Sequence, residues 1–315
     1  MKIKKIDSFY VLVISFYKDL ADSYAKISMF SFGQTDSGEP LHLVVYTNES
    51  IYNVDEIKSS SKNRILINNG IHPGESDGID ASMMLLRDIV QNDSLQKKYQ
   101  NSIICVIPIY NIGGALNRNS HTRANQNGPA EYGFRGNARN YDLNRDFIKQ
   151  DTKNAAAFAE IFHAVNPDVF VDNHVSNGAD YQYAITHLFT QHNKLGGSLG
   201  NFLNATMKPE VEQSLKEKSL GSSITQDRLN LLGEFGIIGG SQKYIDLRPY
   251  PRTPSCLSLG ALNYSLSVII HHKMTTILST IHTCNVRFTS LVILCAYVLS
   301  NPLSAINFHT LEKLG

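Results

Sequence analysis

An α/β fold, with one sheet flanked by helices, is the fold class that this sequence predicts. Three short apolar runs, at residues 64–68, 103–108 and 169–172, have the length and composition of buried strands. Helical patterns lie between them, at residues 80–91 and 151–165. Alternating strands and helices are typical of α/β sheets whose functional site lies along one edge. The chain of 315 residues is long enough to bury a single large core.

The chain starts with an expected helix and hairpin. Residues 9–17 are apolar, and we expect a helix that continues through about Ala25. Charged residues flank this run on both sides and no small-residue cleavage site follows, so it is a poor match to a secretory signal peptide. Alternating residues at 27–32, a turn at 33–38 and a second run at 41–46 then predict two strands joined as a β-hairpin.

The next strand and helix follow the same alternation. The strand at residues 64–68 ends in Asn-Asn-Gly, the form of a buried strand that stops at a functional loop. After this loop, Asp80 is expected to cap a helix that continues to about Gln91, with an apolar face at helical spacing.

The second half of the predicted sheet contains a long polar insertion. The strand at residues 103–108 precedes a region of about forty residues rich in Asn, Gly and Arg, which is too long and polar for a plain connector. A helix over residues 151–165 closes at Asn166-Pro167 and leads into the strand at 169–172.

Composition excludes several classes of protein. Hydrophobic residues make up 42% of the chain and charged residues 18%, which is typical of a soluble globular protein. A net charge of +1 gives no basic surface for nucleic acid. The four cysteines form no Cys-x-x-Cys pair, so neither a disulfide framework nor a cysteine zinc site is expected; they are Cys105, Cys256, Cys284 and Cys295.

Charge is distributed unevenly along the chain. Of the 28 acidic residues, only Glu312 falls in residues 247–315, and the same stretch contains five of the 29 Lys and Arg residues. A folded surface needs charges of both signs, which this tail does not supply. The sequence therefore changes character near residue 250.

Three residues have the types and placement of metal ligands. His72 and Glu75 are three apart in the loop after the strand at 64–68, so a tight turn lets an imidazole and a carboxylate converge. His174 lies at the end of another strand. Two His and one Glu, with a fourth position left for water, are the ligand set of a catalytic zinc site.

The segment between these ligands is rich in planar hydrogen-bond donors. Residues 134–147 hold several arginines and asparagines with few compensating acids. Such donors beside a metal are suited to binding anions, both a substrate carboxylate and a developing oxyanion.

The order of three motifs resembles the zinc carboxypeptidase family of carboxypeptidase A type. The motifs are His72-Pro-Gly-Glu75, then Asp142-Leu-Asn-Arg145, then Pro167-Asp-Val-Phe-Val-Asp-Asn-His174. The likeness extends from about Phe16 to about Pro254. It implies a mixed, twisted sheet of about eight strands with helices on both faces, in agreement with the α/β pattern above.

The resemblance also implies a role for each matching residue. His72, Glu75 and His174 bind one zinc ion. Asn144 and Arg145 hold the C-terminal carboxylate of a peptide, and Asp142 orients a zinc histidine. Arg135 stands where the family places the arginine that stabilises the oxyanion, and Arg139 and Arg123 are poorer candidates. Asn111-Ile-Gly-Gly114 departs from the Asn-Pro-Asp-Gly usual in the family.

The implied reaction is metal-assisted hydrolysis that removes the last residue of a peptide. A glutamate accepts a proton from water and passes it to the leaving amine, and an arginine stabilises the tetrahedral oxyanion. Binding of a free carboxylate by Asn144 and Arg145 restricts cleavage to the chain end.

The expected catalytic glutamate is missing. In the family it comes from a late strand, about twenty residues beyond the family-like segment at 244–255, but no acidic residue occurs between positions 247 and 311. We rank three explanations. In the first, residues 256–315 are an aberrant tail produced by a shifted reading frame, and residues 1–255 are the carboxypeptidase-like domain. In the second, the chain is an inactive relative that binds zinc and peptide C-termini. In the third, His271 or His272 serves as the base.

Substrate, partners and location follow from the same observations. The substrate is a peptide or, as an alternative function, an N-acyl amino acid cleaved by an amidohydrolase with the same zinc and Arg145. We expect a soluble monomer without nucleic-acid or membrane partners. The apolar run at 291–299 is too short to span a bilayer. The compartment cannot be assigned from the sequence.

Overall fold

The computed structural model describes residues 9–49, 51, 53–123, 130–175, 185–189, 192–195, 197–217 and 264–270. The strands are β1 (Ile27–Gln34), β2 (Pro40–Tyr46), β3 (Asn63–Asn68), β4 (Ser102–Ile107), β5 (Arg118–Asn119), β6 (Tyr132–Gly133), β7 (Val169–Val175), β8 (Ile185–Phe189) and β9 (Tyr264–Ile270). The helices are α1 (Phe9–Ser23), α2 (Asp55–Ser59), α3 (Asp77–Gln91), α4 (Asp93–Lys98), α5 (Ile112–Leu116), η1 (Leu143–Arg145), α6 (Lys153–Val165), α7 (His192–Leu195), α8 (Gly197–Phe202), the π-helix η2 (Leu203–Met207) and α9 (Lys208–Glu217).

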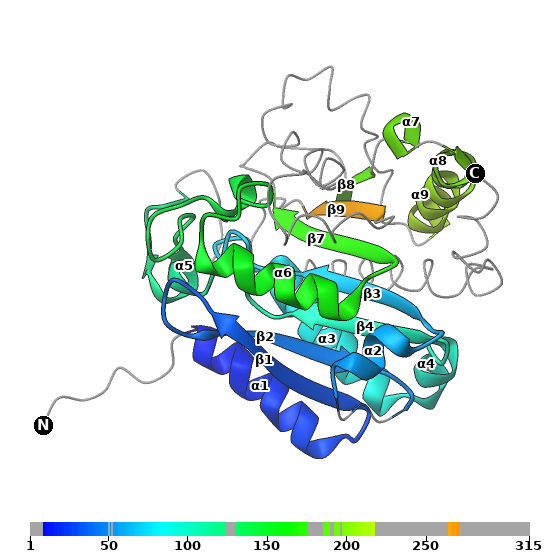
Figure 1. Ribbon diagram of the computed structural model, residues 1–315, viewed down its shortest axis with the longest axis horizontal. Coiled ribbons are helices and arrows are strands. Elements are labelled where there is room, and N and C mark those ends of the chain that lie inside the picture. The colour runs from blue at the N-terminus through cyan, green and yellow to red at the C-terminus, as the bar shows by residue number, and fades with distance from the viewer. Residues whose placement is uncertain are drawn as a thin grey trace, which may run out of the picture.

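One mixed sheet organises these elements. Its described strands lie in the order β1-β2-β4-β3-β7-β9-β8 (Figure 1). The four strands from β4 to β9 are parallel to one another, whereas β1, β2 and β8 pair antiparallel with their neighbours. The mixed α/β sheet is the predicted fold class. The described part of the chain shows seven of the roughly eight strands expected, and β5 and β6 form a separate small sheet.

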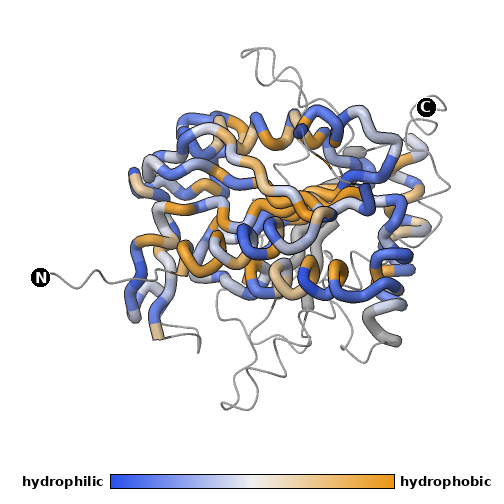
Figure 2. The backbone as a smooth tube through the Cα atoms, turned by 90° about the horizontal axis from the view of Figure 1, so that it is seen from below, coloured by the Kyte–Doolittle hydropathy of each residue, from blue (hydrophilic) through white to orange (hydrophobic). Residues whose placement is uncertain are grey.

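Helices cover both faces of the sheet, as Figure 1 shows. Helix α6 packs across β1, β2 and β3 with α2 beside it, and α1 and α3 pack against each other on the other face. Apolar segments gather in the sheet at the centre of the molecule (Figure 2). Within it Ile65, Leu66 and Ile67 of β3 are almost fully buried. A strand covered on both faces needs such an unbroken apolar run, which is why it was recognisable in the sequence.

Residues at the ends of α6 and at the start of α3 determine where these helices begin or end. Thr152 precedes α6 and its Oγ1 accepts a hydrogen bond from the Ala155 amide, whereas Asn166 closes the helix with a positive φ of 46°. Helix α3 starts at Asp77, so the prediction that Asp80 caps it is wrong. Asp80 lies within the first turn, where burial raises its pKa to about 6.

Strand β7 is longer than the sequence predicted. It continues to Val175 rather than ending at Asp172, so His174 lies within the strand. Strand β3 pairs with β7 only as far as Asn68 opposite Asp172. The last three residues of β7 therefore lie beside the loop that follows β3. Because side chains alternate along a strand, Asp172 and His174 share one face.

No helix among the described residues is both long and apolar enough to cross a membrane.

Candidate metal centre

The loop between β3 and α3 contributes two buried side chains. His72 and Glu75 each have 3% of their surface exposed. The Glu75 amide donates to the His72 carbonyl at 2.9 Å, which closes the tight turn predicted from their spacing. Gly74 between them has no room for a side chain, since a Cβ would lie 2.6 Å from Cδ of Arg123 and 2.9 Å from the carbonyl oxygen of Gly133.

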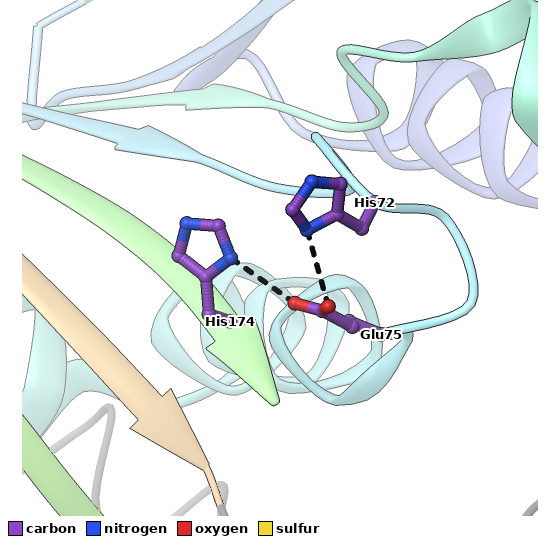
Figure 3. Close-up of side chains that lie close together, drawn as sticks. All are labelled: His72, Glu75 and His174. Carbon is purple, nitrogen blue, oxygen red and sulfur yellow. Dashed lines mark hydrogen bonds and ion pairs between the residues drawn. The ribbon is translucent and has the colours of Figure 1, made fainter. Parts of the chain in front are cut away.

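His174 comes to the same point from β7. His72 Nδ1 lies 3.1 Å from Glu75 Oε1, and His174 Nδ1 lies 3.1 Å from Glu75 Oε2 (Figure 3). One ligand atom from each of the three residues lies within 4.8 Å of the others. We call these three residues the His–Glu–His triad.

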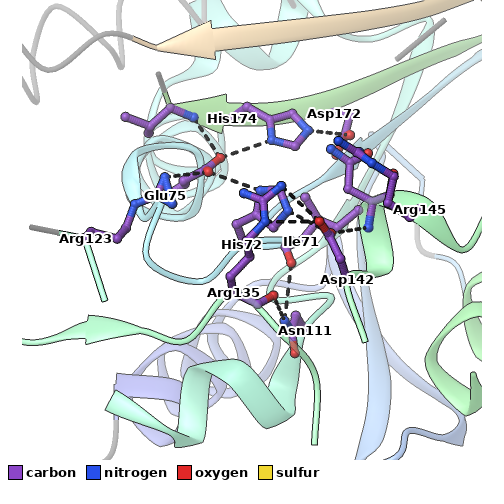
Figure 4. Close-up of polar contacts among 12 residues, drawn as sticks. Ile71, His72, Glu75, Asn111, Arg123, Arg135, Asp142, Arg145, Asp172 and His174 are labelled. Carbon is purple, nitrogen blue, oxygen red and sulfur yellow. Dashed lines mark hydrogen bonds and ion pairs between the residues drawn. The ribbon is translucent and has the colours of Figure 1, made fainter. Parts of the chain in front are cut away.

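Each imidazole is backed by a second carboxylate through its other ring nitrogen. His72 Nε2 lies 3.1 Å from Asp142 Oδ1, and His174 Nε2 lies 2.8 Å from Asp172 Oδ2 (Figure 4). In both rings Nε2 therefore faces an aspartate and Nδ1 faces Glu75.

This arrangement fits a zinc ion. Donors that bind zinc at about 2.0 Å in a tetrahedron lie about 3.3 Å apart. Each imidazole lies 3.1 Å from one oxygen of Glu75, and one ligand atom from each residue lies within 4.8 Å of the others. Two neutral imidazoles and one carboxylate suit zinc by ligand type and leave a fourth position open.

Neighbouring charges shift the pKa values of two triad residues, Glu75 and His174. Burial opposes the charge on Glu75, but the two imidazoles and Arg123 outweigh burial and hold the pKa of this carboxyl well below its ordinary value. Burial also opposes the charge on His174, yet Asp172 and Glu75 raise the pKa of this imidazole to about 10. The two imidazoles and Arg123 thus stabilise the charge of Glu75, and Asp172 and Glu75 stabilise the charge of His174.

The long polar insertion that follows β4 packs beside the triad. Asn111 is buried, and its Nδ2 donates to the carbonyl oxygen of Arg135 at 3.0 Å, which ties this loop to the start of α5. A Cβ on Gly114 would lie 2.2 Å from the carbonyl oxygen of Phe134, so glycine allows the close approach. The departure at residues 111–114 from the usual family motif is therefore part of the packing of this loop.

Arg135 and Asp142 form an ion pair next to the triad. The Arg135 guanidinium lies 3.0 Å from Asp142 Oδ2 and its side chain is 42% exposed. Burial opposes the charge on Asp142, but His72 and Arg135 together lower the pKa of this carboxyl below its ordinary value. Arg135 is thus held at the triad with part of its guanidinium open to solvent.

The two residues expected to bind a substrate carboxylate follow directly in η1. Asn144 is buried, and its Oδ1 has no hydrogen-bond partner among the residues that the structure describes. Arg145 is exposed and donates to the Asn144 carbonyl at 2.9 Å. Figure 4 shows Arg145 near Asp142 and Asp172, beside the triad.

Arg139 and Arg123, the poorer candidates for stabilising the oxyanion, make different contacts from Arg135. Arg139 lies 3.8 Å from Asp36 and stacks on the Tyr141 ring at 4.9 Å, with half its side chain exposed. Arg123 is buried and donates to Glu75 at 2.6 Å. Sequence reasoning missed this contact, because nothing in the spacing between Arg123 and Glu75 indicates it.

Sequence reasoning also missed Asp172. Its position two residues before His174 on a strand was an available signal, because residues i and i+2 share a face. The candidate bases His271 and His272 lie outside the described residues.

Comparison with known proteins identifies the family. The model of the family described as zinc carboxypeptidase matches residues 13–176, more than half of the chain. The chain belongs to the zinc carboxypeptidase family. The resemblance predicted from three ordered motifs is thereby confirmed.

Solved structures agree with this family at the level of the fold. A metallo-carboxypeptidase from Burkholderia cenocepacia is 15% identical, with a TM-score of 0.59 over 94% of this chain and 68% of that chain. A putative carboxypeptidase A from Shewanella denitrificans is 14% identical, with a TM-score of 0.59 over 92% and 69%. The carboxypeptidase A of Helicoverpa armigera is 11% identical, with a TM-score of 0.58 over 93% and 73%. No curated protein matches the sequence significantly. At such identities these structures show that the chain shares the carboxypeptidase fold.

Arg123 gives a first test of the electrostatics of the His–Glu–His triad. Replacing it with methionine removes the cation that touches Glu75 while keeping an apolar stem. We expect the metal-free protein to lose about 3 kcal/mol of unfolding free energy, because a buried carboxylate loses its guanidinium partner. Zinc affinity is expected to rise, since zinc no longer competes with Arg123 for Glu75. Urea unfolding in the presence of a chelator and zinc titration measure the two effects.

The matched control is Arg87→Met. Arg87 pairs with Asp88 at the surface with 41% of its side chain exposed, so the loss should be within about 1 kcal/mol and zinc affinity should not change. A weaker zinc affinity in Arg123→Met would show that Arg123 supports the metal-bound site.

Proposed function

We propose that this chain is built as a zinc-dependent metallocarboxypeptidase-like hydrolase that removes C-terminal residues from peptides. The observation that supports it best is the His–Glu–His triad, whose ligand atoms lie within 4.8 Å of one another. Zinc bound there would polarise the scissile carbonyl and lower the pKa of a water molecule. His72, Glu75 and His174 would hold the ion.

Two residues beside the triad are proposed to select the chain end. Arg145 is exposed and its guanidinium carries N–H donors of the kind that bind a carboxylate, and the neighbouring Asn144 adds an amide. An internal peptide bond presents no free carboxylate to this pair. Binding here therefore orients the last residue of a peptide and favours cleavage of its peptide bond.

Arg135 is proposed to stabilise the oxyanion. Its guanidinium is paired with Asp142, which keeps the charge beside His72 before substrate arrives. The exposed part of the guanidinium can donate to a carbonyl oxygen whose negative charge grows during hydrolysis, and a preorganised donor costs no rearrangement at that step.

The three explanations for the missing glutamate differ in which residue, if any, acts as the general base. Asp142 and Asp172 each already accept a hydrogen bond from a triad imidazole, so neither is suited to accept a proton from water. Sequencing the gene across codon 256 tests the first-ranked explanation, because a restored reading frame with a glutamate in a late strand would give the family's ordinary catalytic set.

A peptide assay tests the proposed function. The zinc-loaded protein is incubated with one peptide that has a free C-terminal carboxylate and with the same peptide amidated at that end. We expect the free peptide to shorten by single residues in mass spectra and the amidated peptide to remain intact, because only the first offers a partner for Arg145.

The other outcomes separate the alternatives. Binding of the free peptide without shortening would identify an inactive relative that binds zinc and peptide C-termini. Cleavage of N-acyl amino acids but not of peptides would identify an amidohydrolase. A purified protein that takes up no zinc would contradict the proposed function altogether.

A further inference from the structure

Asp172 is a buried carboxylate in the middle of the sheet. It lies on β7, which has parallel partners β3 and β9 on its two sides, and none of its surface is exposed. Placing a charged carboxylate at such a position is costly unless hydrogen bonds and nearby charges compensate it. A neutral residue would fill a strand centre at less cost, so the acid needs an explanation.

Two neighbouring side chains hold this carboxylate in a fixed orientation. Oδ1 of Asp172 accepts a hydrogen bond from Nδ2 of Asn68 at 2.9 Å, and Oδ2 lies 2.8 Å from Nε2 of His174. Asn68 is the residue directly opposite Asp172 in the register of β3 and β7. The contact thus depends on the pairing of two core strands rather than on a loop.

The two imidazoles of the triad are supported differently. Asp142, behind His72, comes from the loop before η1, shares its charge with Arg135 and is 27% exposed. Asp172, behind His174, comes from the core and is fully buried. A carboxylate in a low-dielectric core interacts more strongly with the ring that it contacts than one open to solvent does.

We propose that Asp172, oriented by Asn68, is a positioning residue that fixes the Nε2–H tautomer of His174 and directs Nδ1 of this ring to the metal. The inference rests on the proposed zinc site. In this arrangement the core of the sheet supports His174. His72 is supported instead by Asp142, which is paired with Arg135. Carboxylates behind a ligating histidine raise its basicity, and their loss weakens metal binding by about 10- to 100-fold.

Asp172→Asn tests this role with zinc affinity as the readout. We expect the dissociation constant for zinc to rise by about 10- to 100-fold, and the visible absorption of the cobalt-substituted protein to change in position and intensity because His174 is oriented less well. The matched control is Asp168→Asn. Asp168 precedes the same strand and forms a partly buried ion pair with Arg64, so its loss should lower stability but leave zinc affinity within about twofold.

The outcomes separate this inference from the proposed function. A wild-type protein that binds no zinc would overturn both. A wild-type protein that binds zinc, with the same affinity and the same cobalt spectrum in Asp172→Asn, would overturn only the role of Asp172.

Nitrogen NMR of the wild-type zinc form gives a second measurement that does not depend on how the variant folds. We expect His174 to carry its proton on Nε2 and its metal on Nδ1. The opposite assignment would overturn the inference.

Discussion

Replacing His72 by alanine is expected to weaken zinc binding by about 100- to 1,000-fold and to remove any hydrolysis that the zinc-loaded protein performs. The ligands of a structural zinc site together supply about 10–16 kcal/mol, so one ligand contributes about 3 kcal/mol. His72 is buried beside Glu75, and the alanine side chain offers no ligand atom in its place. Zinc content after dialysis and a competitive chelator titration measure the effect.

His42→Ala is the matched control for this experiment. His42 lies on β2, where its Nδ1 contacts the Ser31 hydroxyl, and it takes no part in the triad. Burial and the charge of Lys18 lower its pKa, so it is mostly neutral at pH 7 and its loss should leave zinc content unchanged. If His72→Ala kept full zinc occupancy, the ion would have to bind elsewhere and the proposed metal centre would be wrong.

Much of the fold could be predicted because its signals are local. The apolar run of β3, the hairpin of β1 and β2 and the helix α6 closed by Asn166 are each encoded by a few consecutive residues. The end of β7 was missed because its last residues are polar, which usually indicates a loop. Here Asn173 is retained in the strand by long-range partners, since its Nδ2 donates to Asn69 at 2.7 Å.

The candidate site could be predicted only in part, for a related reason. His72 and Glu75 are close in sequence, so their convergence follows from a single turn. The contact of Arg123 with Glu75 joins residues 48 positions apart, and that of Asp172 with Asn68 joins residues 104 positions apart. Such pairs depend on strand register and loop packing, which no local pattern encodes. The boundary at residue 255 stays a prediction.

A glutamate introduced at position 269 is expected to increase peptide hydrolysis by about 100-fold or more, the usual contribution of a positioned general base. Position 269 of β9 is the register partner of His174 on the neighbouring parallel strand. Positions paired in register share a face of the sheet, so positions 174 and 269 belong to the same face. The natural sequence has no acidic residue between positions 247 and 311. The rate of release of the C-terminal residue from a free peptide measures the gain.

Ile270→Glu is the control that makes this test specific. Position 270 pairs with Val175 and lies on the opposite face of the strand, so the same new charge should give no gain in rate. Zinc content and thermal unfolding of both variants show whether the added carboxylate disturbs the fold. An increase confined to Ile269→Glu means that the zinc and carboxylate sites are intact and only the base is missing. Equal and measurable hydrolysis by the wild-type protein and Ile269→Glu, with zinc bound in both, would mean that a group already in the chain performs the proton transfer. No hydrolysis by either protein would contradict the expected gain.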